Sequence, residues 1–213
     1  MKSIEANGYE VFFNEEGYKS MNLFISQKNY SNIFIISDTN SNENCLPKFL
    51  PLLETDKNIE IIEIEPGETE KNITTCVEIW SILTELGADR KSLVINLGGG
   101  VVTDLGGFVS STFKRGIDFI QIPTTLLSMV DASIGGKLGI DFNGVKNSIG
   151  VFKDPKAVFV DPFFLETLPK RELRSGFAEI IKHALISDEI LWRQISTINI
   201  HTEKNWTPII LDS

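Results

Sequence analysis

Residues 93–104 read LVINLGGGVVTD, and the fold of the chain can be inferred outward from this segment. Residues 93–97 are almost all apolar, and a run of this length suits a buried strand better than a helix. Three glycines follow at once, Gly98, Gly99 and Gly100. Apolar residues then recur at helical spacing over 101–113. The stretch therefore predicts a strand, a tight glycine turn and a helix.

A helix that begins directly after such a turn presents unpaired backbone N–H groups and the positive end of its dipole. Both favour a bound phosphate, and glycine lets the backbone come close to a ligand and adopt positive φ angles. The alternative is an ordinary strand-to-helix turn without a ligand, because the motif is not G-x-G-x-x-G. The turn alone leaves both interpretations open.

Strand-like and helix-like segments alternate through most of the chain. Short strands at 1–6 and 11–13 indicate a hairpin around Asn7 and Gly8. Further strands are expected at 33–36, 59–64, 119–122 and 157–160, and helices at 45–53, 74–86 and 126–134. A polar, glycine-containing segment lies between 134 and 157. The alternation predicts an α/β fold with a doubly wound, mostly parallel sheet.

The pattern changes after Pro169. Residues 171–187 and 189–198 read as two helices, and no further strand is evident up to Ser213. We therefore expect one domain over 1–166 and the start of an all-helical domain over 167–213. The second part is too short for an independent core of ordinary size, so we expect it to be incomplete.

Composition excludes several classes of function. The chain of 213 residues has a net charge of −9, which argues against non-specific binding to nucleic acid or an anionic membrane. Its two cysteines form no CxxC pair, and a reducing compartment is the default. No signal peptide and no run of membrane-spanning length is visible, so we expect a cytoplasmic protein.

The residues suited to chemistry gather where strands are expected to end. Parallel sheets bind ligands beyond the carboxyl ends of their strands. Six groups stand there, namely Asp38, Glu68, the three glycines, Asp104, Thr124 and Thr125. Asp38 could hold a ribose hydroxyl or merely cap the next helix. The shared location predicts a nucleotide or phosphate site more strongly than any one residue does.

Charged residues farther along the chain suit a phosphorylated substrate. Lys137, Lys146 and Lys182 lie near expected turns or on a helix, where they could bind an acidic substrate or simply be solvated. Asp131 sits in an otherwise apolar helix and needs a partner or a function. A satisfied structural role for Asp131 remains open.

Glu179 and His183 stand four residues apart and share one face of the expected helix. A carboxylate and an imidazole at that spacing could bind one metal ion, but two ligands leave the site incomplete. The chain has only one other histidine, His201. We therefore do not expect a three-ligand catalytic metal site built wholly within this chain.

Four segments together carry a family resemblance: LGGGVVTDLGGF, IPTTLLSMVDASIGGK, GVKNSIGVF and TLPKRELRSGFAEIIKHALI. They resemble the 3-dehydroquinate synthases, members of the sugar phosphate cyclases, in order over 33–195. The resemblance implies a Rossmann-like domain followed by a helical domain, with the active site between them. It implies conversion of 3-deoxy-D-arabino-heptulosonate 7-phosphate to 3-dehydroquinate and phosphate, in the shikimate pathway of aromatic amino acid biosynthesis. The cofactors implied are NAD and a divalent metal, Zn²⁺ or Co²⁺.

The resemblance also assigns roles to individual residues. The residues that it places against NAD are Asp38, Pro66, Gly67, Glu68, Thr69, Glu70, Lys71, Gly100, Val101, Val102, Thr103, Asp104, Thr124, Thr125, Lys137, Lys146, Phe164, Leu165, Glu166 and Thr167. The residues that it assigns to the substrate and catalysis are Lys137, Lys146, Asp131, Asn147, Lys182 and Arg115. Arg115 would reach across the interface of a homodimer. Glu179 would be a metal ligand, whereas His183 falls at a position that is not one.

Two departures qualify the resemblance. The family's other two metal ligands are histidines in a downstream motif like GHTxGHA, which is absent here, and Pro66 stands where the family often has Asp. We therefore expect the chain alone to be inactive. The alternatives are another sugar phosphate cyclase, an NAD-binding fragment without catalysis and, more distantly, a metal-dependent polyol dehydrogenase.

Overall fold

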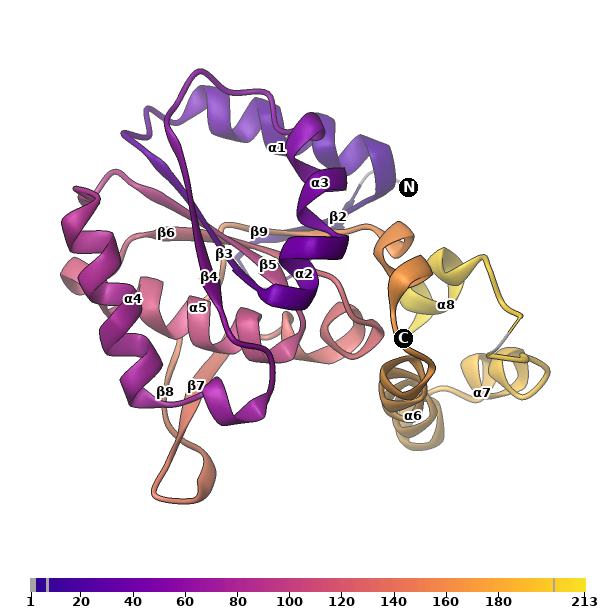
Figure 1. Cartoon of the computed structure of the whole chain (residues 1–213). Helices are drawn as coiled ribbons and strands as arrows, with labels where there is room; N and C mark the ends of the chain where they lie inside the picture. The colour runs from indigo at the N-terminus through magenta and orange to yellow at the C-terminus, as the bar shows by residue number, and fades with distance from the viewer. Residues whose placement is uncertain (1–2, 7, 201) are drawn as a thin grey trace.

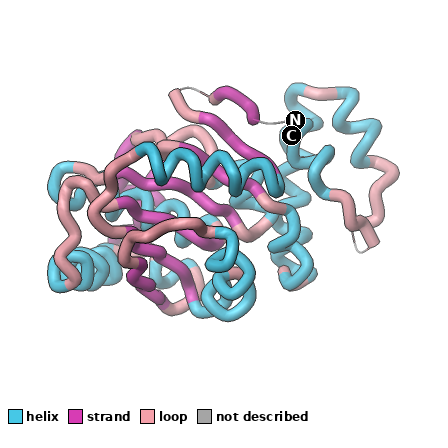
Figure 2. Tube along the Cα trace, turned by 90° about the horizontal axis from the view of Figure 1, so that it is seen from above, coloured by secondary structure: helices cyan, strands magenta, loops and turns pink. Residues whose placement is uncertain are grey.

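The computed structural model describes residues 3–6, 8–200 and 202–213. A seven-stranded sheet forms its centre (Figure 2). Its strands are β1 (Ser3–Glu5), β2 (Glu10–Phe13), β3 (Ile33–Asp38), β4 (Ile59–Ile64), β5 (Leu93–Gly98), β6 (Asp118–Pro123) and β9 (Ala157–Val160). The order is β1-β2-β9-β6-β5-β3-β4, and every pairing is parallel except that of β1 with β2.

Helices cover both faces of the sheet (Figure 1). One face carries α1 (Asn14–Gln27), α2 (Thr39–Asn44), α3 (Leu46–Phe49) and the 3₁₀ turn η1 (Leu50–Leu52). The other face carries α4 (Ile73–Glu85) and α5 (Gly100–Thr112), with the 3₁₀ turns η2 (Glu68–Glu70) and η3 (Phe113–Arg115). The doubly wound, mostly parallel sheet expected from the sequence is confirmed.

A two-stranded antiparallel ribbon, β7 (Lys137–Phe142) and β8 (Val145–Phe152), projects beyond the α5 side of the sheet (Figure 1). The π-helical turn η4 (Ser128–Ala132) precedes it, and the 3₁₀ helix η5 (Pro162–Thr167) follows β9. The helices α6 (Lys170–Ser187), α7 (Glu189–Ile195) and α8 (Trp206–Asp212) then lie to one side of the sheet.

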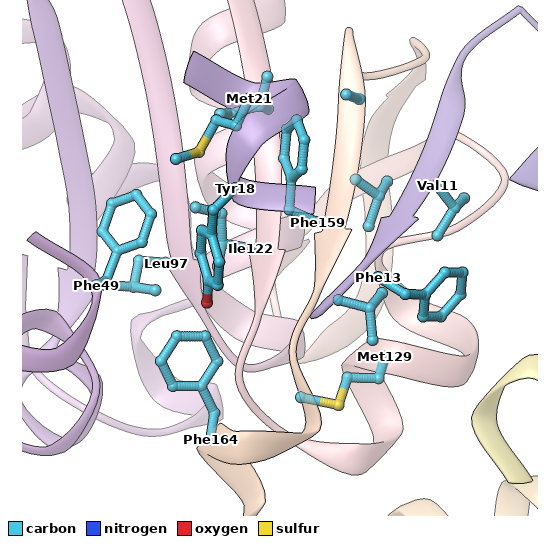
Figure 3. Close-up of a cluster of buried hydrophobic side chains, with 14 of the residues drawn as sticks. Val11, Phe13, Tyr18, Met21, Phe49, Leu97, Ile122, Met129, Phe159 and Phe164 are labelled. Atoms are coloured by element: carbon cyan, nitrogen blue, oxygen red, sulfur yellow. The ribbon is translucent and has the colours of Figure 1, made fainter. Parts of the chain in front are cut away.

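Two apolar cores flank the sheet, one on each face. Strand residues alternate between them: Ile33 and Ile35 point into the core under α1, and Phe34 and Ile36 into the core under α4 and α5. Figure 3 shows side chains from β2, α1, α3 and η5 meeting in the first core. Ile180 of α6 belongs to this core too, so the C-terminal helices pack against the sheet region. The division at 166/167 stays a prediction.

The expected strands at 33–36, 59–64, 93–97, 119–122 and 157–160 are all present. The N-terminal hairpin is present as well, although Met1, Lys2 and Asn7 lie outside the described residues. Helix α7 ends at Ile195 rather than at 198. Within the described part of the chain, no helix is long and apolar enough to cross a membrane.

Candidate functional site

The glycine turn between β5 and α5 lies at the topological switch point, where the order in which strands are added to the sheet reverses. From β3 the chain proceeds outward to β4, whereas β5, β6 and β9 follow one another on the other side of β3. Ligands of open α/β sheets bind at such a reversal, beyond the carboxyl ends of the strands. No side chain caps α5 at Gly99. Its first N–H groups are therefore free to bind an anion.

Close packing, rather than backbone conformation, requires the glycines here. The expectation of positive φ is wrong, because none of the three has a left-handed φ, and Gly99 has φ −76° and ψ −171°. A Cβ at Gly98 would lie 2.6 Å from Val102 Cβ, and one at Gly99 would lie 2.9 Å from Thr125 Cγ2. Small residues therefore let the strand end, the helix and the next strand end converge.

Two buried amides fix the start of α5 to the sheet. Asn96 Nδ2 donates to Gln121 Oε1 at 3.0 Å, and Gln121 Nε2 donates to the Thr103 carbonyl oxygen at 3.0 Å. Both side chains are almost fully buried. A Cβ at Gly106 would lie 2.0 Å from Asn96 Oδ1, so only a glycine lets the backbone of α5 pass this close to the amide. The sequence pattern did not predict this pair, although a polar residue inside an apolar strand was a signal.

A buried ion pair joins three separate segments beside this helix. Lys71 Nζ lies 2.5 Å from Asp104 Oδ2 and donates to Asn147 Oδ1 at 2.6 Å. Burial raises the pKa of Asp104 to about 6; Lys71 opposes this rise, and the charges of Glu68 and Asp131 add to it. All five residues were candidates from the sequence. The structure brings them near one another and pairs two of the expected NAD contacts, Lys71 and Asp104, with each other.

The β7–β8 ribbon places further candidate residues beside Lys71. The Asp141 N–H donates to the Lys71 carbonyl oxygen at 2.7 Å, and the Asn147 N–H donates to Asp141 Oδ1 at 2.8 Å. Lys146 Nζ lies 3.0 Å from Glu68 Oε1, and the hydrogen bond and charge of Glu68 raise the pKa of Lys146. Lys137 begins β7 and is exposed. The polar segment of the sequence is therefore a hairpin that carries Lys146, close to its tip, toward η2, whereas Lys137 lies at its base.

The remaining cofactor candidates lie at other strand ends. Asp38 caps α2, because its Oδ1 accepts hydrogen bonds from the backbone N–H and the hydroxyl of Ser41 at 2.7 Å each. The capping role is confirmed, and a ribose contact stays a prediction. Thr124 N–H donates to the Gly98 carbonyl oxygen at 2.9 Å, which ties the ends of β5 and β6. In η5, Phe164 and Leu165 are buried in the core, whereas Glu166 and Thr167 are exposed.

A second cluster joins the π-turn to α6. Ligand atoms of Asp131, Glu179 and His183 all lie within 4.8 Å of one another. His183 Nε2 lies 3.4 Å from Glu179 Oε1, and Lys182 forms an ion pair with the same carboxylate. We call Asp131, Glu179 and His183 the acid–histidine cluster. The sequence predicted that Glu179 and His183 share one face of the helix but not the approach of Asp131, which depends on packing between distant segments.

Arg115 lies apart from the Lys71–Asp104 ion pair and from the acid–histidine cluster. It belongs to η3, beyond the C-terminal end of α5, whereas the glycine turn lies at the N-terminal end of this helix. Arg115 is exposed, with φ 69°, between Lys114 at φ 49° and Gly116 at φ 106°. Left-handed φ angles at two consecutive non-glycine residues are uncommon and indicate local strain.

Comparisons with known proteins identify the family to which the chain is similar. The family model of the 3-dehydroquinate synthase N-terminal region matches residues 61–175. A 3-dehydroquinate synthase of Parabacteroides distasonis is 45% identical over 84% of this chain and 50% of that protein. The chain thus spans about half the length of the curated relatives it matches.

Solved structures resemble the fold closely. The 2-epi-5-epi-valiolone synthase ValA of Streptomyces hygroscopicus, solved with NAD⁺ and Zn²⁺, has a TM-score of 0.84 and 26% identity, over 100% of this chain and 61% of that one. A 2-deoxy-scyllo-inosose synthase, solved with carbaglucose-6-phosphate, NAD⁺ and Co²⁺, has a TM-score of 0.77 and 25% identity, over 84% of this chain and 49% of that one.

Proposed function

The chain belongs to the 3-dehydroquinate synthase family, and from this premise we propose that the protein converts 3-deoxy-D-arabino-heptulosonate 7-phosphate to 3-dehydroquinate and phosphate. One observation of the structure carries the proposal. The uncapped start of α5, the β7–β8 ribbon and the acid–histidine cluster belong to one neighbourhood. Asn147 of the ribbon binds Lys71, the partner of Asp104 on α5, and a Cβ at Gly100 would lie 3.4 Å from Ala132 Cβ, next to Asp131. That neighbourhood combines groups for a dinucleotide, a phosphorylated substrate and a cation.

The start of α5 fits the pyrophosphate of NAD. Its free N–H groups and helix dipole would bind the charge, and Gly99 and Gly100 at this start are only partly buried. Lys71 would hold the ribbon in place through Asn147, and Lys137 and Lys146 would then lie beside the cofactor and substrate. Bound NAD would supply the transient oxidation and the final reduction of the substrate.

The acid–histidine cluster fits a divalent cation. Its carboxylate oxygens and imidazole nitrogen are donors that Zn²⁺ and Co²⁺ accept, and the Glu179 side chain is only 20% exposed. We assign Glu179 as the ligand and Asp131, Asn147 and Lys182 as contacts to the substrate. A bound cation would polarise a substrate hydroxyl. Lys182, paired with Glu179, would balance charge beside a phosphorylated substrate.

The test is an assay of phosphate release by the full-length protein with NAD and Zn²⁺ present. We expect release from the heptulosonate phosphate. The similarity to ValA and to 2-deoxy-scyllo-inosose synthase supports one second candidate, another sugar phosphate cyclase. Turnover of sedoheptulose 7-phosphate or glucose 6-phosphate instead would establish that candidate. Release of NADH in step with substrate consumption would identify a polyol dehydrogenase.

The 213-residue chain by itself serves as an NAD-binding module in this proposal, because most of the proposed NAD contacts lie within it. Calorimetry of the chain with NAD tests this: we expect binding without turnover. We further infer a cytoplasmic homodimer, in which Arg115 contacts the substrate bound to the other subunit. The turn at Lys114 and Arg115 is strained and exposed, which supports a contact of the Arg115 side chain with a second subunit.

A further inference from the structure

Helix α6 crosses the segment before the π-turn at Gly176. A Cβ at Gly176 would lie 2.4 Å from the backbone N of Leu127, 2.6 Å from Leu126 Cβ and 2.7 Å from the Leu126 carbonyl carbon. Two of these three atoms belong to the backbone, and Leu126 is fully buried. No flexible side chain can therefore move aside to admit a methyl group.

The local conformation gives no reason for glycine at this position. Gly176 lies inside an 18-residue helix and does not have a left-handed φ. A glycine inside a helix is less favourable than alanine. The close crossing is therefore the property of α6 that depends on Gly176.

On each of the two crossing segments, the contact lies about one helical turn before a residue of the acid–histidine cluster. Glu179 follows Gly176 by three residues, and Asp131 follows Leu127 by four. Asp131 is carried by the π-turn, where the Ser133 N–H and hydroxyl both donate to the Ser128 carbonyl oxygen, at 3.2 and 2.7 Å. The distance between the two backbones thus sets how closely Asp131 approaches the pair on α6.

We propose that Gly176 is a positioning residue, which places Glu179 and His183 of α6 against Asp131 by allowing backbone contact with Leu126 and Leu127. For an alanine Cβ to reach ordinary contact distance of 3.4 Å, the two segments must separate by about 1 Å. Glu179 is the assigned cation ligand, and metal–ligand distances vary by only about 0.2 Å in well-formed sites, so a shift of α6 by about 1 Å would move Glu179 out of the geometry that the cation requires. The inference rests on the proposed function to the extent that Glu179 binds the cation.

The test compares Gly176→Ala with Ile180→Ala in the full-length protein. Ile180 is fully buried on the same helix, so its truncation opens a cavity without adding an atom at the crossing. Co²⁺ affinity and the Co²⁺ absorption spectrum report the cation site, NAD affinity from calorimetry reports the sheet site, and thermal unfolding reports stability. None of these measurements needs turnover.

For Gly176→Ala we expect about a 10- to 100-fold loss of Co²⁺ affinity and an altered spectrum, with NAD affinity within about twofold of wild type. For Ile180→Ala we expect a lower unfolding temperature with nearly unchanged Co²⁺ affinity. Equal losses in the two variants, unchanged Co²⁺ binding by Gly176→Ala, or joint loss of its folding and NAD binding would overturn the proposal. Wild type that binds Co²⁺ but turns over none of the sugar phosphates would refute the proposed function alone.

Discussion

Replacing Lys71 with methionine removes the cation from a buried ion pair while keeping much of the side-chain volume. The side chains of Lys71 and Asp104 are only 5% and 16% exposed, so the pair is poorly solvated. Breaking a buried pair from one side typically costs about 3–5 kcal/mol, because the remaining charge stays buried without a partner. We expect a loss of this size in the free energy of unfolding at neutral pH.

The pH dependence follows from Asp104. Its pKa is raised from 3.8 to about 6, which corresponds to about 3 kcal/mol, and Lys71 is the group that limits the rise. Without Lys71 the pKa of folded Asp104 rises further. A carboxyl with a raised pKa in the folded state stabilises the protein at low pH and loses that contribution as pH rises through the folded pKa. The deficit of Lys71→Met should therefore shrink by about 1–2 kcal/mol between about pH 7.5 and pH 5.

Urea-induced unfolding, followed by circular dichroism at both pH values, measures this difference. Lys156→Met is the matched control, because Lys156 pairs with Asp118 at 3.4 Å on the surface, with side chains 44% and 36% exposed. We expect it to cost less than about 1 kcal/mol at either pH. A Lys71→Met deficit that stayed constant or grew toward pH 5 would show that buried Asp104 does not cause the loss. Failure of Asp104→Asn to restore stability in the double variant would show the same.

Three further outcomes are expected. In the full-length protein, Glu179→Gln should retain NAD binding but lose Zn²⁺ affinity and turnover, whereas His183→Ala should keep its zinc content by metal analysis; the reverse pattern would contradict the assignment of the ligand. Gln121→Leu should lower the free energy of unfolding by about 1–3 kcal/mol, because it leaves the buried Asn96 amide without its acceptor, and unchanged urea denaturation would argue against that role. Mixing inactive Arg115→Ala and Glu179→Gln proteins should restore about a quarter of wild-type turnover if the arginine acts across a dimer, and no recovery would place it within its own subunit.

The sequence predicted the sheet because its central strands are mostly apolar and bounded by clear turns. All six residues of β5 are buried, so the apolar run read directly as a central parallel strand. The ribbon was missed for the opposite reason. Seven of the eight residues of β8 are exposed, and Gly139 and Gly150 pair across the ribbon, so no buried face marks it as a strand.

Some helices and side-chain contacts could not be predicted from the local sequence pattern. Helix α1 was not predicted: four of its 14 residues are buried, and its polar composition masks the buried stripe. Helix α8 was also missed, whereas the helix expected at 126–134 is present and only its π-helical form was not predicted. The Lys71–Asp104–Asn147 contacts and the approach of Asp131 to α6 join segments far apart in the chain. The resemblance identified these residues as candidates, but only three-dimensional packing shows which of them touch.

The position of β2 in the sheet has a consequence for biosynthesis. This strand has its parallel neighbour in β9, with Phe13 opposite Val160, so its partner is made 147 residues later. At ordinary translation rates of about 5–20 residues per second, β2 waits roughly 7–30 s on the ribosome. During that interval the inner edge of β6, which β9 later covers, is open as well. Unpaired strand edges of this kind are templates for pairing with other chains, so the nascent protein is most exposed to aggregation until residue 160 has emerged.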